Sequence, residues 1–247
     1  MKDFQTSTEQ INVLIAIQAR SNSTRFPQKI YQMIGKKMVL QHVIDQAKSA
    51  KIYIERPSKK NIKCDIVVLH PEDDNQLISN FRNSGVLLLS GNEHDVLSRY
   101  IKAYNALKPA YIVRLTSDCP LILDFIISKH INVAVLNQYD YVSNVEESCR
   151  QSADGLDCEI LSAKTMEWLS AQELTKDEKE HVTLAIRKRR PPELRQAFIS
   201  SKFDTSAFKL SLDTQEDLDK IRDHYHQREF KLNIAMKTFG RNNIFEI

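Results

Sequence analysis

Short apolar runs alternate with segments of helical periodicity through the first half of the chain. Runs typical of strands occupy residues 11–17, 65–69, 86–89 and 111–115. The segments between them, at 39–50, 75–82 and 96–107, space their apolar residues as amphipathic helices do. The first run is apolar at nearly every position, as expected where helices cover both faces of a parallel sheet. The pattern predicts βαβ units and a Rossmann-like α/β fold.

The second half of the chain is less regular. Strand-like runs occur at 139–142, 158–161, 197–201 and 208–212, and helical segments at 163–174, 177–190 and 214–228. This order favours a mixed edge on a mainly parallel sheet. No repeat or Gly/Ser linker interrupts the chain, so we expect a single domain over 1–247, with 140–200 as an arm for dimerisation or sugar binding. Residues 48–63 look like an exposed loop, to which the sequence assigns no function.

Composition excludes several classes of protein. The 247 residues are 42% hydrophobic, enough for a sizeable core, and 35 basic against 32 acidic residues give a formal charge of +3. That balance argues against a nucleic-acid surface but suits acidic small ligands. The four cysteines form no C-x-x-C pair, and no apolar run approaches the length of a membrane span. We expect a cytoplasmic protein without nucleic-acid or membrane partners.

The loop after the first apolar run carries the clearest chemical signal. Arg20, Arg25 and Lys29 lie within ten residues of one another, among short side chains such as that of Ser23. Guanidinium forks, an ammonium and accessible backbone N–H groups suit the binding of phosphates. The alternative is a solvated basic loop. Because open α/β sheets bind ligands at the carboxyl ends of their strands, we prefer a phosphate site.

Two aspartates follow later strand-like runs, Asp118 after 111–115 and Asp213 after 208–212. Taken singly, Asp213 is explained as a helix cap and Asp118 as the start of a turn. Beside a cationic phosphate loop, two carboxylates indicate a Mg²⁺ site, because this ion binds one or two carboxylates together with substrate phosphates.

Six segments, in this order, carry a resemblance to a known family. They are Q-A-R-x-x-S-T-R-x-P-x-K at 18–29, D-V-L-x-R-Y at 95–100, V-R-L-T-x-D-C-P-L-I at 113–122, D-G-L-D-x-E at 154–159, E-H-V-T at 180–183 and L-D-T-x-E-D at 212–217. Each is weak alone, but the six together are specific. The chain resembles the cytidylyltransferases that make CMP-activated acidic sugars, most closely their spore-coat polysaccharide branch.

The resemblance implies a GT-A-like nucleotidyltransferase with a three-layer α/β/α sandwich, a homodimer, and roles for particular residues. The catalytic cations are Arg20, Arg25 and Lys29. The nucleotide-binding residues are Ala19, Arg20, Ser23, Arg25, Lys29, Asp95 and Arg99. The metal-binding residues are Asp118 and Asp213. The sugar-binding residues are Asp154, Asp157, Glu159 and His181. Without the family, the helix dipole explains Asp95 as an acidic residue in the first turn of a helix, a solvated turn explains 154–159, and a lone histidine on a helix has no assigned role.

Two positions of the phosphate loop depart from the family pattern. Asn22 and Gln28 stand where relatives usually have glycine. Asparagine tolerates left-handed backbone better than other non-glycine residues, so Asn22 is expected to keep the loop shape, whereas the effect of Gln28 is not predicted.

The predicted reaction is attack by a sugar hydroxyl on the α-phosphorus of CTP, with Mg²⁺ as cofactor and pyrophosphate as the leaving group. Two alternatives remain open. One is the same reaction with GTP or UTP, because the base-reading residues are not identified. The other is a nucleotide-sugar binding module without turnover. The presence of Lys29, Asp118 and Asp213 together favours the enzyme.

Overall fold

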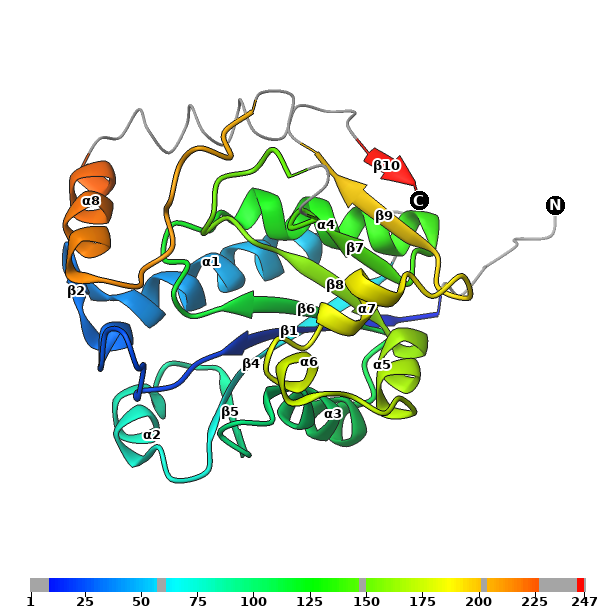
Figure 1. Cartoon of the computed structure of the whole chain (residues 1–247), viewed down its shortest axis with the longest axis horizontal. Helices are drawn as coiled ribbons and strands as arrows, with labels where there is room; N and C mark the ends of the chain where they lie inside the picture. The colour runs from blue at the N-terminus through cyan, green and yellow to red at the C-terminus, as the bar shows by residue number, and fades with distance from the viewer. Residues whose placement is uncertain (1–8, 57–60, 147–149, 201–203, 227–243, 247) are drawn as a thin grey trace, which may run out of the picture.

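The computed structural model describes residues 9–56, 61–146, 150–200, 204–226 and 244–246. Among these residues the main feature is an eight-stranded sheet with the order β10-β9-β7-β8-β6-β1-β4-β5 (Figure 1). The strands β1 (Ile11–Gln18), β4 (Ile62–Pro71), β5 (Leu87–Gly91) and β6 (Tyr111–Thr116) are parallel.

The other half of the sheet mixes strand directions. β8 (Glu159–Ser162) is antiparallel to both β6 and β7 (Tyr141–Ser143), β9 (Gln196–Ile199) is parallel to β7, and β10 (Ile244–Glu246) is antiparallel to β9. The expected mixed, mainly parallel Rossmann-like sheet is confirmed. Residues 140–200 contribute strands to this central sheet, and their role as an arm for dimerisation stays a prediction.

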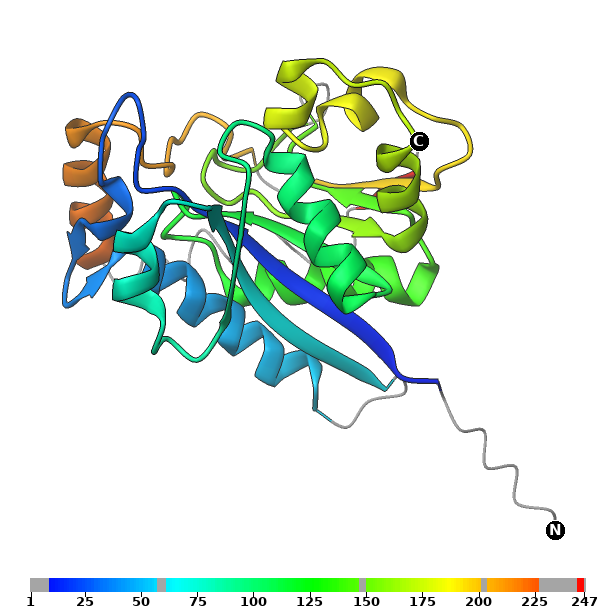
Figure 2. The same ribbon diagram turned by 90° about the horizontal axis from the view of Figure 1, so that it is seen from below.

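Helices cover both faces of the sheet. α1 (Val39–Ile54) and α4 (Asp124–Asn137) pack on one face, and α3 (Val96–Leu107) and α5 (Ala163–Ser170) pack on the other. Figure 2 shows α1 and α3 on opposite sides of β1 and β4. Alternate side chains of β1 enter the two cores, Ile15 on one side and Leu14 on the other, which explains why this strand is apolar throughout.

Smaller elements complete the layers. α6 (Lys176–Glu180) and α7 (Leu184–Arg189) lie on the α3 side, and α2 (Asn75–Phe81) follows β4. The 3₁₀ helix η1 (Lys29–Tyr31) and the hairpin of β2 (Met33–Ile34) and β3 (Lys37–Met38) lie between β1 and α1 in the sequence, and α8 (Gln215–His226) contacts β2. No helix in the described part of the chain has the length and apolar character needed to cross a lipid bilayer.

Several predicted boundaries are wrong. The supposed loop 48–63 is largely ordered structure, because α1 continues to Ile54 and β4 begins at Ile62, while 57–60 lie outside the described residues. The helix expected over 177–190 is two helices, interrupted where Val182 has a φ of 51°. Residues 208–212 form no strand and make one isolated bridge, between Asp154 and Lys209. α4 was not predicted.

Candidate active site

A cleft of about 440 Å³ opens beside the carboxyl ends of β1 and β6. This is where open α/β sheets place ligands. Twelve of the thirteen predicted site residues line this cleft, and Asp95 is the one that does not. The predicted residues that line the cleft are Ala19, Arg20, Ser23, Arg25, Lys29, Arg99, Asp118, Asp154, Asp157, Glu159, His181 and Asp213.

The loop after β1 is held in shape by a carboxylate from another segment. Asp74 accepts hydrogen bonds from the backbone N–H of Ser21, at 2.8 Å, and from its hydroxyl group, which also contacts the hydroxyl of Tyr31. The same carboxylate caps α2 by accepting from the N–H of Leu77 at 3.1 Å. Asp74 therefore fixes the start of the cationic loop relative to the rigid end of β4.

The two departures from the family pattern differ in backbone conformation. Gln28 has a φ of 59°, in the left-handed region that favours glycine, and its N–H donates to the carbonyl oxygen of Ser21 at 2.9 Å. Asn22 is not among the described residues with positive φ. The expected compensation by asparagine is therefore not needed, and Gln28 is where the loop stores strain.

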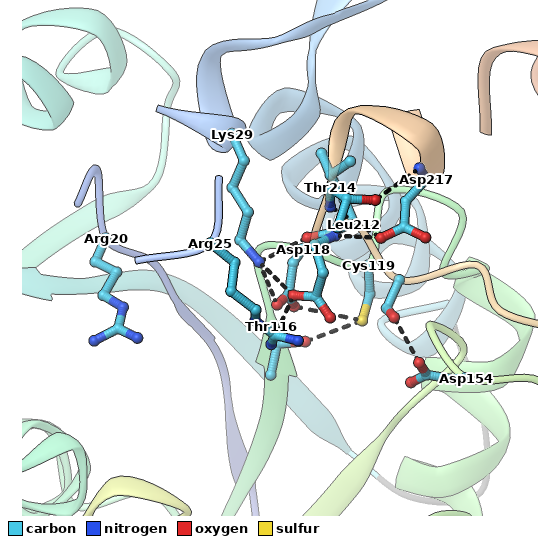
Figure 3. A network of polar contacts seen from close by, with 12 residues as sticks. Arg20, Arg25, Lys29, Thr116, Asp118, Cys119, Asp154, Leu212, Thr214 and Asp217 are labelled. Atoms are coloured by element: carbon cyan, nitrogen blue, oxygen red, sulfur yellow. Dashed lines mark hydrogen bonds and ion pairs between the residues drawn. The ribbon is translucent and has the colours of Figure 1, made fainter. Parts of the chain in front are cut away.

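Lys29, Asp118 and Asp213 meet at one end of the cleft, which we call the Lys29 end. Figure 3 shows the Lys29 ammonium beside Asp118 and Leu212. The Lys29 ammonium donates to Asp118 Oδ2 at 2.9 Å, to the carbonyl oxygen of Leu212 at 2.7 Å and to Asp213 Oδ1 at 3.2 Å. Burial raises the pKa of Asp118, but the charge and hydrogen bond of Lys29 outweigh it and hold that pKa below its usual value. The Asp118 carboxylate is thus placed to carry negative charge.

Further cations surround Asp213. Arg25 approaches Asp213 Oδ1 at 3.0 Å, and Lys209 approaches Asp213 Oδ2 at 3.6 Å. The Arg25 side chain is 71% exposed, so it is free to move toward a ligand. Arg20 lies apart from this group and forms a 3.8 Å ion pair with Glu180 of α6; Figure 3 shows its guanidinium pointing away from Lys29.

The expected cap at Asp213 is wrong in detail. Thr214 caps α8, because its hydroxyl accepts from the N–H of Asp217 at 3.2 Å, and Asp217 Oδ2 in turn accepts from the N–H groups of Asp213 and Thr214, each at 2.9 Å. Asp213 precedes this capping box, so its carboxylate is free to face the cleft. The capping role that would give Asp213 a purely structural explanation is filled by Thr214 and Asp217.

The donor set at the Lys29 end fits a magnesium ion. Asp118 and Asp213 place hard carboxylate oxygens within 3.2 Å of one ammonium nitrogen, so the two side chains already converge on a single positive charge. Mg²⁺ is bound in proteins by one or two carboxylates together with waters and substrate phosphates. No cluster of three or more acidic, histidine or cysteine side chains suited to a metal occurs among the described residues.

Backbone contacts fix Asp213 relative to Asp118. The N–H of Leu212 donates to the carbonyl oxygen of Asp118 at 2.8 Å. On the other side, Gly155 has a φ of 97° and lies so close to Leu210 that a Cβ atom would come within 2.3 Å of the Leu210 carbonyl carbon. Glycine is therefore required at this turn. The segment before Asp213 is thus held by the Asp118 backbone on one side and by the Gly155 turn on the other.

The opposite end of the cleft, which we call the Glu159 end, is formed by β6, β8 and the turn before β8. Arg114 and Glu159 are directly opposed in the β6–β8 register and form a buried ion pair, and the Tyr141 hydroxyl donates to the same carboxylate. Burial raises the pKa of Glu159, but Arg114 and Tyr141 outweigh it, so that the pKa lies below its usual value. This carboxylate is a fixed charge.

A second ion pair lies beside it, in the turn that precedes β8. Arg150 Nη2 donates to Asp157 Oδ1 at 2.6 Å and lies 3.6 Å from Asp154 Oδ1. Asp154 Oδ2 accepts from the hydroxyl of Ser211 at 2.5 Å. Burial raises the pKa of Asp157 to about 7, with Arg150 opposing it and Asp154 adding to it. The two aspartates of the predicted sugar-binding turn thus have different hydrogen-bond partners, Arg150 for Asp157 and Ser211 for Asp154.

His181 and Arg187 come from the interrupted helical segment above this end. His181 is 56% exposed at its side chain and lies 3.6 Å from Asp177. Val182, fully buried, takes the left-handed conformation that β-branched residues rarely adopt, and this breaks the helix just after His181. Arg187 lines the cleft, and its Nε is a buried donor without a hydrogen-bond acceptor among the described residues.

Two predicted nucleotide-binding residues have structural roles. Asp95 does not line the cleft; it caps α3 by accepting from the N–H of Ser98 at 2.8 Å. Arg99 is 2% exposed and donates to the carbonyl oxygens of Leu69, at 3.2 Å, and Ala19, at 3.4 Å. Burial lowers the pKa of Arg99. Arg99 therefore fixes the backbone where β1 and β4 enter the cleft.

The sequence analysis missed several lining residues. Among them are Arg114, Arg150, Arg187 and Ser211. Arg114 lay within a recognised segment, and its approach to Glu159 follows from the antiparallel pairing of β8 with β6. No local signal in the sequence marks Arg150 or Ser211, because both act through a turn that brings distant segments together.

The fold and the site define an α/β protein with a cationic loop after its first strand and paired carboxylates facing it. A family model described as cytidylyltransferase matches residues 14–238. The chain belongs to the cytidylyltransferase family and is a nucleotidyltransferase, which confirms the predicted resemblance.

Individual relatives agree with this assignment. The chain is 29% identical over 223 residues, covering 87% of each chain, to the spore coat polysaccharide biosynthesis protein SpsF of Bacillus subtilis strain 168. A solved cytidylyltransferase of Leptospira borgpetersenii is similar with a TM-score of 0.78 and 26% identity, over 91% of this chain and 92% of that one. A CMP:2-keto-3-deoxy-manno-octonic acid synthetase solved with CTP shares the fold, with a TM-score of 0.61 and 12% identity, over 87% and 99%.

Proposed function

We propose that this protein transfers the cytidylyl group of CTP to a hydroxyl group of an acidic sugar and releases pyrophosphate. The observation that carries the proposal is the convergence of Lys29, Asp118 and Asp213 at one end of a cleft in a cytidylyltransferase. A cation that is shared between two carboxylates is poised to exchange them for phosphate oxygens.

The loop after β1 holds the triphosphate in this proposal. Arg25 and Lys29 bind the β- and γ-phosphates and stabilise the charge that develops on the leaving pyrophosphate, with Arg20 on the same loop. Ala19 and Ser23 lie on the backbone that approaches the nucleotide. Arg99 acts indirectly by fixing the carbonyl oxygen of Ala19, and Asp95 by capping the helix that carries Arg99.

Asp118 and Asp213 hold Mg²⁺ in this proposal. When bound, the ion supplies positive charge at the α-phosphate as the in-line transition state forms. Lys29 then contacts phosphate oxygens instead of both carboxylates. The capping box of Thr214 and Asp217 keeps Asp213 directed at the cleft throughout.

The Glu159 end binds the acceptor sugar. Asp154, Asp157, Glu159 and His181 line it and offer acceptors to sugar hydroxyl groups. Arg187 brings a guanidinium to the lining of the same cleft, which supports an acceptor with a carboxylate. A relative named for spore coat polysaccharide biosynthesis supports a role in the synthesis of surface polysaccharides.

The test is pyrophosphate release by the purified protein with Mg²⁺, using CTP, UTP, GTP and ATP separately, each with a panel of acidic sugars. Release with CTP alone supports the proposal. Release with GTP or UTP alone keeps the reaction class and overturns the choice of nucleotide. Tight nucleotide binding without release across the whole panel overturns catalysis in favour of a binding module.

The homodimer implied by the resemblance is also a proposal, with residues 140–200 as its interface. Light scattering during size-exclusion chromatography measures the mass directly. A mass of twice 28.6 kDa is expected, and a mass of 28.6 kDa contradicts it.

A further inference from the structure

The carboxylate of Asp157 has one oxygen held and one oxygen without a partner. Arg150 binds Oδ1 at 2.6 Å, whereas Oδ2 accepts no hydrogen bond from the residues that the structure describes. The side chain lines the cleft and is 22% exposed. Asp157 is therefore oriented by an arginine while it keeps a free lone pair toward a ligand.

The other carboxylates at the cleft are already engaged. Both oxygens of Glu159 are bound, Oε2 by Arg114 and Oε1 by Tyr141. Asp154 Oδ2 accepts from Ser211. Asp118 and Asp213 face the Lys29 ammonium, where the proposed function places the metal. Asp157 therefore combines a place at the proposed acceptor site with an oxygen atom that no described residue engages.

Asp157 also lies within electrostatic reach of the Lys29 end. Cys119 directly follows Asp118, and its thiol pKa is raised by burial first and then by the charges of Asp118, Asp157 and Asp154. Asp154 shares Arg150 as an ion-pair partner with Asp157. Asp154 also accepts a hydrogen bond from Ser211, in the segment that leads to Asp213. Asp157 and the residues of the Lys29 end thus line one continuous cleft.

We propose that Asp157 is the general base that accepts the proton of the attacking acceptor hydroxyl, with Arg150 as the residue that positions it. This inference rests on the proposed function. The acceptor oxygen forms a bond to the α-phosphorus while the bond from that phosphorus to the bridging oxygen of the pyrophosphate breaks. The bonding electron pair leaves with pyrophosphate, and the hydroxyl proton moves to Oδ2 of Asp157.

The surroundings of Asp157 suit this task. Burial raises its pKa to about 7, Arg150 and Arg114 lower it, and Asp154 and Glu159 raise it. A general base is most effective when its pKa lies near the working pH, because it is then both deprotonated and basic. An ordinary aspartate, with a pKa of about 3.9, would be a much weaker proton acceptor.

The test is the pH dependence of kcat/KM for the acceptor at saturating CTP, in variants that shift the Asp157 charge in opposite directions. The wild type is expected to lose activity as the pH falls through about 7. Arg150→Gln removes a cation that favours the carboxylate, so its acid limb moves to higher pH. Asp154→Asn removes a neighbouring anion, so its acid limb moves to lower pH. Each shift is expected to be about one pH unit.

Asp157→Asn provides the direct control. It is expected to reduce kcat by about 10² to 10⁴-fold and to abolish the acid limb, with unchanged CTP binding in calorimetry. An Asp157→Asn enzyme that keeps the acid limb overturns the proposal, as do variants of Arg150 and Asp154 whose limbs do not move apart. Turnover by the wild type tests the proposed function separately.

A measurement without turnover separates the two proposals further. Carbon-detected NMR titration of the Asp157 carboxyl group in the resting protein is expected to give a pKa near 7. A pKa in the ordinary range of aspartate overturns the role as general base whether or not an acceptor has been found. Loss of the Asp157 signal in Asp157→Asn assigns the resonance.

Discussion

The two ends of the cleft hold their charges in different ways. At the Lys29 end, one ammonium is shared by Asp118 and Asp213, and exposed Arg25 lies nearby. At the Glu159 end, a carboxylate that is 1% exposed is fixed in the sheet by Arg114 and Tyr141. In the proposed function, the first arrangement exchanges its partners for phosphate oxygens. The second is a fixed framework, whose disruption costs folding energy rather than ligand binding alone.

The largest effect on stability is expected for Glu159→Gln. The substitution leaves the buried Arg114 guanidinium facing a neutral amide, and breaking a buried ion pair from one side costs about 3–5 kcal/mol. Urea denaturation measures the loss. Glu216→Gln is the matched control, because its ion pair with Lys220 is exposed and is worth less than about 1 kcal/mol.

Acid denaturation provides a second measurement on the same variant. The pKa of Glu159 lies below its usual value in the folded protein, so its contribution is present at neutral pH and is lost as the pH falls below about 4.3. Glu159→Gln should therefore show a shallower fall in unfolding free energy at acid pH than the wild type. An equally steep fall would mean that the pair with Arg114 is not a fixed charge pair.

In contrast to Glu159→Gln, the Asp213→Asn substitution is expected to lower activity strongly and stability little. Lys29 keeps Asp118 and the Leu212 carbonyl oxygen as partners, so the fold changes little, whereas turnover falls by about 10² to 10³-fold. Asp219→Asn is the control, because this aspartate lies on α8 with its side chain 61% exposed. Full activity in Asp213→Asn would remove Asp213 from the proposed metal site.

Gly155 joins the two ends, so its replacement should affect both. Gly155→Ala places a Cβ against the Leu210 backbone in a left-handed conformation, at a cost of about 2 kcal/mol, and shifts the segment that leads to Asp213. Gly85→Ala is a matched control with a φ of 72° but only the flexible end of Lys48 nearby, at 3.5 Å. If both variants lose the same stability, backbone strain alone explains the effect and Gly155 does not clamp Asp213.

The parallel half of the fold could be predicted because its signals are local. β1 alternates residues between two cores that are both apolar, and the turn residues that follow it mark its end. α4 was not predicted because its sequence is apolar on most sides, with Ile126, Ile127 and Ile131 all buried. Without a polar face, the sequence lacks the alternation of polar and apolar residues that indicates an amphipathic helix. The break at Val182 depends on tertiary packing, which no local propensity records.

The site residues also differ in how far the sequence could predict them. Lys29, Asp118 and Asp213 follow strands or strand-like runs, and the order of motifs identified them before the structure placed them together. The pairing of Arg150 with Asp157 could not be predicted, because it depends on the Gly155 turn. That turn is held by Leu210, whose N–H donates to the Asp154 carbonyl oxygen at 2.6 Å across more than fifty residues of sequence.

The smallest expected effect concerns Gln28, where the phosphate loop adopts a left-handed conformation without glycine. Gln28→Gly relieves a left-handed strain of about 1–2 kcal/mol, part of which the greater entropy of glycine in the unfolded chain offsets, so the free energy of unfolding should rise by about 0.5 kcal/mol. Asn22→Gly is the control within the same loop; because Asn22 has no positive φ, glycine there only increases the entropy of the unfolded chain and lowers stability. Urea denaturation of both variants, with CTP titrations, measures the difference. A gain at Asn22 instead of Gln28 would contradict the assignment of strain, whereas a gain at Gln28 with weaker CTP binding would show that the strained backbone holds the loop in its binding conformation.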